Sequence, residues 1–272
     1  TYTVASSDTN AAVAFTIDYN DLAGNAGAQV VNTTTDSTSV SVDTDAPGLS
    51  SVSIISNNAL NTSLAMAGDT ITLSMTSDEA LLVDPVVAFT GANNAATVSH
   101  VGGNSYEASY LVSGSDTNGA LGFTIDITDL AGNVDQFTAT TNSSSVRIDT
   151  VNVAVSSFTM SDTALKKGDT ATVTLIFSEA VHGFSSATEI TVIDNGTLSN
   201  MTSSDGGTTW VGTFTPKDNL DLDATNILTL ANTYTDLAGN AGVSVSTANY
   251  EVDTSRPSMV ITSANGASSG KY

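Results

Sequence analysis

The chain has 272 residues, 40% of them hydrophobic and only 12% charged, with 28 acidic against six basic side chains and a net charge of −22 at pH 7. This acidic excess repels nucleic-acid phosphates and anionic lipid surfaces, and no apolar run reaches the ~18–20 residues of a membrane span, so we expect no nucleic-acid partner and no membrane insertion. The chain has no cysteine, which excludes disulfides, thiolate metal sites and cysteine nucleophiles.

Alternating apolar and polar residues predict β-strands along the whole chain. Residues 15–19, 71–75, 123–127 and 173–177 carry a large apolar side chain at every second position, as half-buried strands do. Clusters of Gly, Asn, Asp and Ser between such runs are typical of turns, and no segment has a helical period. About seven runs per hundred residues predict an all-β fold of immunoglobulin-like Greek-key β-sandwich domains.

The sequence repeats with a period of roughly one hundred residues, which is the size of a whole domain. The pentapeptide Asp-Leu-Ala-Gly-Asn begins at residues 21, 129 and 236. A second marker, Val-Asp-Thr or Ile-Asp-Thr, follows it at residues 42–44, 148–150 and 252–254. Gly-Asp-Thr occurs at residues 68–70 and again at 168–170. Several markers in one order at one period indicate tandem domains in a linear array.

We place the domain borders just after the Asp-Thr markers, where Pro47 and Pro257 stiffen two of the links. Residues 45–150 and 151–254 are then two complete domains. Residues 1–44 are expected to be the C-terminal part of an earlier domain, and residues 255–272 the first strand of a following one.

The pentapeptide turn, a strand ending in Val-Asp-Thr and a proline together resemble the bacterial Ig-like repeats of giant surface adhesins, including RTX-like adhesins. Residues 161–254 resemble one subtype closely, through Gly168-Asp169-Thr170, Phe177-Ser178-Glu179-Ala180-Val181, Asp194-Asn195-Gly196-Thr197-Leu198, residues 203–210 and Phe214-Thr215-Pro216. The resemblance implies an extracellular or cell-surface extender that holds a ligand-binding tip away from the cell, with neighbouring Ig-like domains as partners. It also implies structural calcium at the domain junctions. Asp45-Ala46-Pro47 becomes Val151-Asn152-Val153 at the second junction, where we expect weaker binding or none.

Strand order gives a separate reason to expect a cation at these junctions. In a seven-stranded sandwich, the loops after the second, fourth and sixth strands lie at the pole where the chain enters. Carboxylates that gather there repel one another unless a hard cation lies among them. Calcium takes 6–8 oxygen ligands and fits irregular loops better than magnesium or zinc. Extracellular modules typically bind it with a dissociation constant of ~10⁻⁴–10⁻³ M. The candidate ligands are Asp43, Asp45, Asp78, Glu79 and Asp129 for the first complete domain, Asp149, Glu179, Asp205 and Asp236 for the second, and Asp253 at the third marker.

A purely structural interpretation of these residues stays open. Asp before Gly-Asn often serves only to accept backbone N–H groups in an Asx-turn. Residues 27–44 and 134–149 contain an additional strand-like stretch, which would change the strand count and weaken the assignment of loops to poles.

The sequence does not favour an enzyme. His100 and His182 lie far apart without repeat counterparts, so no nucleophile–base–orienter set can be drawn. Asp221 and Asp223 resemble a glycosidase pair only by spacing, and Trp210 lies in a predicted strand, where a core position is favoured over a sugar-stacking platform.

Three functions remain for comparison. The first is an adhesin extender, in which the mechanical role is spread over the repeats. The second is a subunit of an extracellular filament or sheath, in which sheet edges pair with identical chains. The third is a ligand-binding accessory module of a larger extracellular protein.

Overall fold

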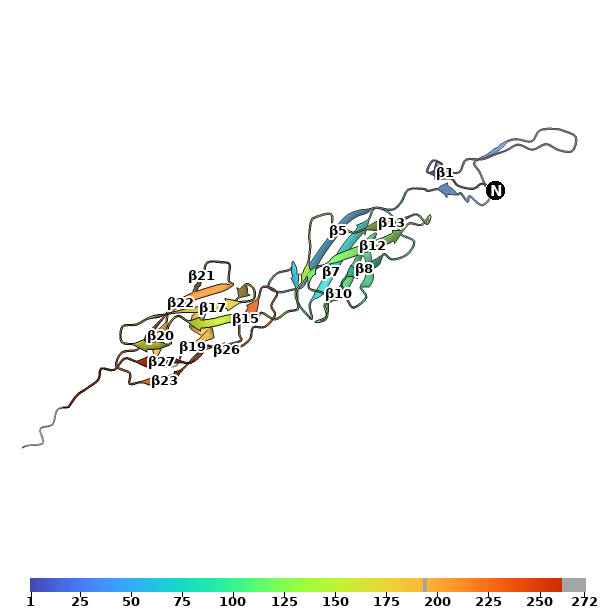
Figure 1. Ribbon diagram of the computed structural model, residues 1–272. Helices are drawn as coiled ribbons and strands as arrows, with labels where there is room; N and C mark the ends of the chain where they lie inside the picture. Colours follow the sequence, from blue (N-terminus) through green and yellow to red (C-terminus); the bar gives the residue numbers. More distant parts are fainter. Residues whose placement is uncertain (193–194, 261–272) are drawn as a thin grey trace, which may run out of the picture. The chain divides into compact units, whose positions relative to one another are not determined.

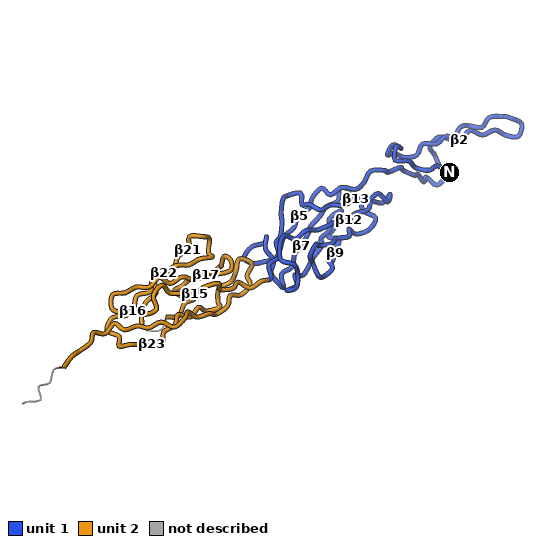
Figure 2. The backbone as a smooth tube through the Cα atoms, in the orientation of Figure 1, with its two compact units in different colours: residues 1–150 blue, residues 151–272 orange. Residues whose placement is uncertain are grey.

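The computed structural model describes residues 1–192 and 195–260, and the chain divides into two compact units, residues 1–150 and 151–272 (Figure 2). The regular structure of these residues is almost entirely β, which confirms the predicted fold class (Figure 1). The exception is a single helical turn, α1 (Ser186–Glu189). No helix among the described residues has the length and apolar character needed to cross a bilayer.

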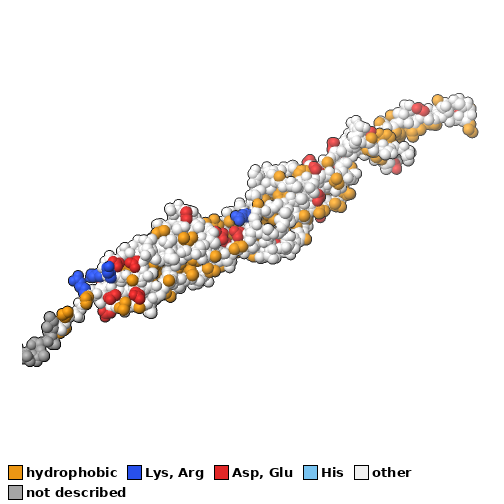
Figure 3. Space-filling view, in the orientation of Figure 1, with side chains coloured by type: hydrophobic (Ala, Val, Ile, Leu, Met, Phe, Trp, Pro, Cys, Tyr) orange, Lys and Arg blue, Asp and Glu red, His pale blue; other side chains and the backbone are white. Residues whose placement is uncertain are grey.

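Residues 1–44, which we call the N-terminal segment, form two small antiparallel strand pairs, β1 with β4 and β2 with β3. Most hydrophobic side chains on this segment lie at the surface (Figure 3). Tyr2 and Ile17 are 69% and 51% exposed, whereas their repeat counterparts Tyr110 and Ile125 are 1% and 0% exposed. The four strands are β1 (Ala11–Ala12), β2 (Thr16–Ile17), β3 (Val30–Val31) and β4 (Ser41–Val42).

The rest of the first unit is a β-sandwich, here called the first sandwich (residues 49–148). One sheet has the antiparallel order β5-β7-β10-β9 and the other the order β13-β12-β8, which correspond to the ABED and CFG sheets of an immunoglobulin fold. The strands are β5 (Leu49–Ser56), β6 (Leu64–Ala65), β7 (Thr70–Ser77), β8 (Val86–Thr90), β9 (Thr97–Gly102), β10 (Ser105–Leu111), β11 (Gly119–Ala120), β12 (Gly122–Thr128), β13 (Val134–Phe137) and β14 (Arg147–Ile148).

The predicted alternation fills the core of this sandwich. Ile71, Leu73 and Met75 of β7 are buried, while Thr72 and Ser74 between them are only half-buried. The apolar positions of β12 are buried in the same cluster. Each fully buried aliphatic side chain of this size stabilises the fold by roughly 1.5–3 kcal/mol.

The second sandwich (residues 155–253) repeats this plan in the second unit. Its sheets have the orders β15-β17-β22-β20, with β21 also paired to β22, and β19-β24-β26. The half-buried Trp210 of β22 packs edge-on against Phe184, with ring centroids 4.7 Å apart. The strands are β15 (Val155–Met160), β16 (Ala164–Lys166), β17 (Ala171–Phe177), β18 (Val181–His182), β19 (Ile190–Val192), β20 (Gly196–Leu198), β21 (Thr202–Ser203), β22 (Thr209–Pro216), β23 (Asp223–Asn226), β24 (Leu228–Leu230), β25 (Thr235–Asp236), β26 (Val245–Ser246) and β27 (Tyr250–Asp253).

Each sandwich ends with a strand beyond the two main sheets. After β13, the chain forms β14, which pairs in parallel with β6, and after β26 it forms β27, which pairs in parallel with β16. The additional strand-like stretch therefore adds a strand without removing β13 from its sheet. The strand expected over residues 255–272 lies mostly outside the described residues, and residues 255–260 have no regular structure.

Candidate metal site

Three carboxylates from distant parts of the sequence meet where the chain enters the first sandwich. Asp43 follows β4, Glu79 follows β7 and Asp129 follows β12, and each offers an oxygen within 4.8 Å of the others. The turns after β7 and β12 end at the same pole of the sandwich, as strand order requires. Residues 43–48, here called the linker, bring Asp43 to that pole. We call these three residues the acidic trio.

Asp129 is fully buried and is fixed by its own pentapeptide turn. Its Oδ1 accepts the N–H groups of Ala131, Gly132 and Asn133 at 2.7–2.8 Å. Burial by itself would raise the pKa of Asp129, but the hydrogen bonds from the Asn133 side chain and from these backbone groups lower it below its ordinary value. Gly132 takes φ = 97°, a conformation that favours glycine. The carboxylate is therefore ionised and held in place.

The same turn forms at the two other copies. Oδ1 of Asp21 accepts from Ala23 and Asn25, and Oδ1 of Asp236 accepts from residues 238–240. The structural interpretation of this aspartate thus holds at all three positions. Whether a copy can bind a metal therefore depends on the residues around the turn, which differ between copies.

Glu79 lies in a concentration of negative charge. Its pKa is raised, first by burial and then by the charges of Asp129, Asp43, Asp78 and Asp45. The sequence from residue 45 to 150 contains a single Lys or Arg, Arg147, which lies on β14. Mutual repulsion at this pole is therefore not relieved by a basic side chain of the same sandwich.

The remaining two candidates of this group hold the linker. Asp78 Oδ1 accepts the Gly48 N–H at 2.8 Å, and the Asp45 N–H donates to Asp43 Oδ1 at 3.2 Å. A Cβ on Gly48 would lie 2.5 Å from Asp78 Oδ2, so a larger residue here would displace the Asp78 carboxylate. Asp78 and Asp45 shape the path of the chain beside the acidic trio.

In the second sandwich, Glu179 and the fully buried Asp236 offer oxygens within 4.8 Å of one another. Asp149 ends the first unit, where its N–H donates to the Ala65 carbonyl at 2.8 Å. Asp205 caps its own turn by accepting from Thr209 and Ser203, and these bonds hold its pKa well below the usual range. Asp253 ends β27 and accepts from Ser255 Oγ at 3.3 Å.

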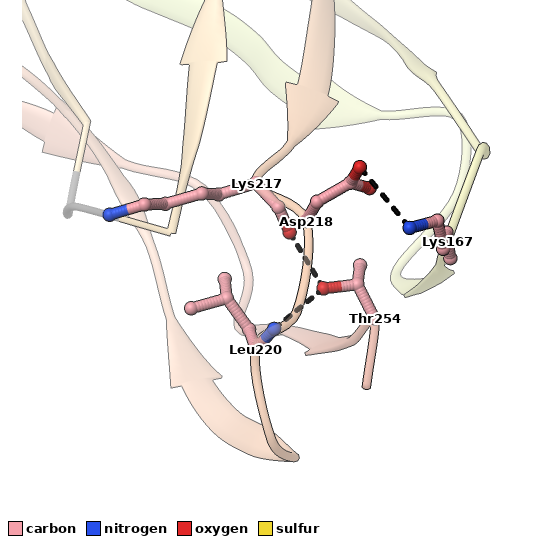
Figure 4. Close-up of polar contacts among 5 residues, drawn as sticks. All are labelled: Lys167, Lys217, Asp218, Leu220 and Thr254. Atoms are coloured by element: carbon pink, nitrogen blue, oxygen red, sulfur yellow. Dashed lines mark hydrogen bonds and ion pairs between the residues drawn. The ribbon is translucent and has the colours of Figure 1, made fainter. Parts of the chain in front are cut away.

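Sequence reasoning missed the residues that anchor the threonine of each Asp-Thr marker. Thr44 donates its N–H and Oγ1 to Asn10 Oδ1 at 2.9 and 2.8 Å, and Thr150 does the same to Asn118 Oδ1. In the second sandwich, Thr254 Oγ1 accepts the Leu220 N–H and donates to the Lys217 carbonyl (Figure 4). A detectable signal was present, because Asp-Thr-Asn occurs at residues 8–10 and again at 116–118.

The donor chemistry of the acidic trio fits a hard divalent cation. All three side chains offer carboxylate oxygen, whereas zinc sites are built chiefly from sulfur and nitrogen. The three groups come from a linker and two turns, and irregular geometry of this kind suits calcium better than the strict octahedron of magnesium. The trio is thus a candidate metal site.

Comparison with known proteins finds a family match for the second complete repeat. Residues 149–252 match the family model described as a bacterial Ig-like domain. One similar solved structure is a Ca²⁺-stabilized adhesin that helps an Antarctic bacterium reach out and bind ice, with 19% identity, a TM-score of 0.36, and coverage of 89% of this chain and 57% of that one. Another is the IG1+IG2 portion of DIP-gamma, with 13% identity, a TM-score of 0.36, and coverage of 77% and 98%. No curated protein matches the sequence.

Proposed function

Because residues 149–252 are a bacterial Ig-like domain, we propose that this chain is an extender segment of a bacterial surface adhesin and that calcium stiffens the linker before the first sandwich. In this role the repeats serve as spacers, and the partners of each are its neighbours along the chain. The proposal places the segment outside the cell. The role is mechanical and not catalytic.

The observation that carries the proposal is the composition of the acidic trio. Asp43 belongs to the linker, whereas Glu79 and Asp129 belong to the sandwich, and their oxygens lie within 4.8 Å of one another. A cation that binds all three must attach the linker to the sandwich. Its binding free energy therefore opposes bending of the linker and unfolding of the sandwich together.

The electrostatics support a cation at this position. The pKa of Glu79 is raised first by burial and then by the neighbouring carboxylates, and both disfavour its charged form. A bound divalent ion reverses the sign of the local field and stabilises the charged form of each ligand. Calcium therefore gains from the same charge concentration that destabilises the metal-free sandwich.

The two histidines lie in different sandwiches. His100 Nε2 hydrogen-bonds the Gly103 carbonyl and its ring stacks on Tyr106, while His182 is exposed on β18 in the other sandwich. Among the described residues, neither histidine hydrogen-bonds a serine or an acidic side chain, as activation of a nucleophile would require.

Thermal melting of the whole chain in calcium and in EDTA tests the proposal. At 10 mM calcium, a site with a dissociation constant of ~10⁻⁴–10⁻³ M stabilises the folded state by about 1.4–2.7 kcal/mol, which raises the melting temperature of a domain this size by about 5–20 °C. Small-angle scattering should show a longer particle in calcium, and EDTA should reverse both effects. Identical melting and scattering curves with and without calcium would refute the proposal, and magnesium at the same concentration serves as the control.

A further inference from the structure

We propose that Asn133 is a positioning residue that ties the linker to the first sandwich without any metal and so presents Asp43 to the cation. The first half of this statement is independent of the proposed function. The second half, the effect on calcium affinity, rests on it. The inference is carried by two hydrogen bonds from one side-chain amide.

The Asn133 amide bridges two members of the acidic trio. Its Nδ2 donates to Asp129 Oδ2 at 2.7 Å and to the Asp43 carbonyl at 3.3 Å. An amide NH₂ has two hydrogens, and here each has an acceptor. Asp129 is itself fixed by its turn, so Asn133 transfers that fixed position to the backbone of the linker.

The neighbouring linker residues are held from other directions. Asn10 Oδ1 accepts from Thr44, and Asn10 Nδ2 donates to Asp43 Oδ1 at 3.4 Å. Four residues further on, Asp78 accepts from Gly48. Asn10 of the N-terminal segment thus holds the start of the linker, at Asp43 and Thr44, while Asn133 and Asp78 hold the linker on the side of the sandwich.

The pentapeptide by itself does not create this tie. Asn25 stands at the same position of an identical turn, and its Nδ2 donates to Asp21 Oδ2 at 2.8 Å, with no bond to another segment among the described residues. The turn-capping role is common to Asn25 and Asn133, whereas the bond to a linker carbonyl occurs at Asn133. This difference supplies a matched control within one chain.

A tie of this kind lowers the entropic cost of metal binding. Fixing free backbone costs conformational entropy, and a linker that is already held has less freedom to lose when Asp43 becomes a ligand. We therefore expect Asn133 to affect both the mobility of the metal-free linker and the affinity for calcium.

The test is hydrogen exchange of the linker amides in EDTA, measured by mass spectrometry on the whole chain with Asn133→Ala and with Asn25→Ala. One hydrogen bond is worth about a fivefold change in the opening equilibrium, so peptides covering residues 43–48 should exchange about fivefold faster in Asn133→Ala. Peptides from β7 report any general destabilisation and should change less. Asn25→Ala should leave the linker unchanged. Equal linker exchange in Asn133→Ala and the unmodified chain overturns the inference.

A second variant covers the case in which Asn133→Ala fails to fold. Asn133→Ser keeps one donor for the turn but cannot serve both acceptors, and it should also accelerate linker exchange. Calcium titration of the same proteins by melting separates the two proposals. If calcium does not change the melting temperature of the unmodified chain, but the Asn133 variants still exchange their linker amides faster, the proposed function alone is contradicted. An unmodified chain that binds calcium while these variants leave both the linker and the affinity unchanged contradicts the tie alone.

Discussion

At the residue scale, the aspartate of the pentapeptide turn combines two roles that the sequence analysis treated as alternatives: it caps its turn and it lies in the candidate metal site. Asp129 satisfies the backbone of its own turn and also lies beside Glu79 and Asp43. Strand order was enough to predict this grouping. It was not enough for Asp205, which accepts from Ser203, Thr208 and Thr209 within its own turn and does not join Glu179 and Asp236. Whether a carboxylate stays within its own turn or also lies beside others cannot be read from a pattern of residue types.

Glu79→Gln should change the stability of the first sandwich with opposite signs in EDTA and in calcium. In EDTA at neutral pH the substitution removes a partly buried charge that its neighbours repel, so we expect the melting temperature to rise, by at most about 4–8 °C because solvent screens the repulsion. In calcium it removes a ligand, and the melting temperature should fall relative to the unmodified chain. Asp84→Asn, the same loss of charge in the same loop, is the control. A change of the same sign in both conditions would contradict the assignment of Glu79.

The pH dependence of the metal-free protein follows from the same raised pKa. A folded-state pKa above the unfolded value means that the folded chain binds the proton more tightly, so the contribution of Glu79 to stability is complete below its unfolded pKa. That contribution is lost as the pH rises through the folded pKa. Urea titrations in EDTA between pH 3.5 and pH 7 give the free energy of unfolding of the unmodified chain and of Glu79→Gln. The difference between the two should show the contribution of Glu79 disappear with rising pH. A difference that stays constant with pH would show that burial and the neighbouring carboxylates do not raise the pKa of Glu79 in the folded chain.

At the scale of elements, the long strands could be predicted and the short ones could not. β7, β12 and β17 follow directly from alternating apolar residues. The two-residue strands β6 and β14 carry no periodic signal, because two residues cannot show a period. Their parallel pairing depends on where the sandwich ends, which is a property of the tertiary structure.

One edge of the first sandwich is covered by side-chain hydroxyls instead of a strand. The Val52 N–H donates to Thr141 Oγ1 at 3.0 Å and the Ile54 N–H donates to Ser144 Oγ at 2.9 Å, while the Thr141 N–H returns a bond to the Val52 carbonyl. These bonds satisfy the outward backbone groups of β5, which would otherwise form an open edge.

Replacing Thr141 by Val should therefore destabilise the first sandwich although the shape is kept. Loss of the hydroxyl leaves the Val52 N–H without its acceptor, and we expect the free energy of unfolding in urea to fall by about 1–2 kcal/mol. Ser145→Ala, in the same segment but with no bond to β5, should have little effect. Equal stability of the Thr141→Val and unmodified chains would show that the hydroxyl does not cap this edge.

At the scale of the whole molecule, the two sandwiches have separate cores. The buried cluster of the first contains residues 52–148 and that of the second residues 153–252, with no member in common. The N-terminal segment contributes no member to either cluster, and most of its apolar side chains are exposed. We therefore expect the two sandwiches to unfold as two independent transitions.

Equivalent core substitutions test this independence. Leu73 of β7 and Leu175 of β17 are both fully buried, and truncation of each to alanine should cost about 2–5 kcal/mol. In differential scanning calorimetry, Leu73→Ala should lower one transition and Leu175→Ala the other. A shift of both transitions by either substitution would show that the two sandwiches fold as one cooperative body.

Direct calcium binding, measured by isothermal titration calorimetry, tests the central claim that the acidic trio holds calcium. We expect the unmodified chain and Asp84→Asn to bind calcium with a dissociation constant of ~10⁻⁴–10⁻³ M, and we expect Glu79→Gln to weaken that binding at least tenfold, a loss of about 1.4 kcal/mol. Unchanged affinity and stoichiometry in Glu79→Gln would contradict the claim.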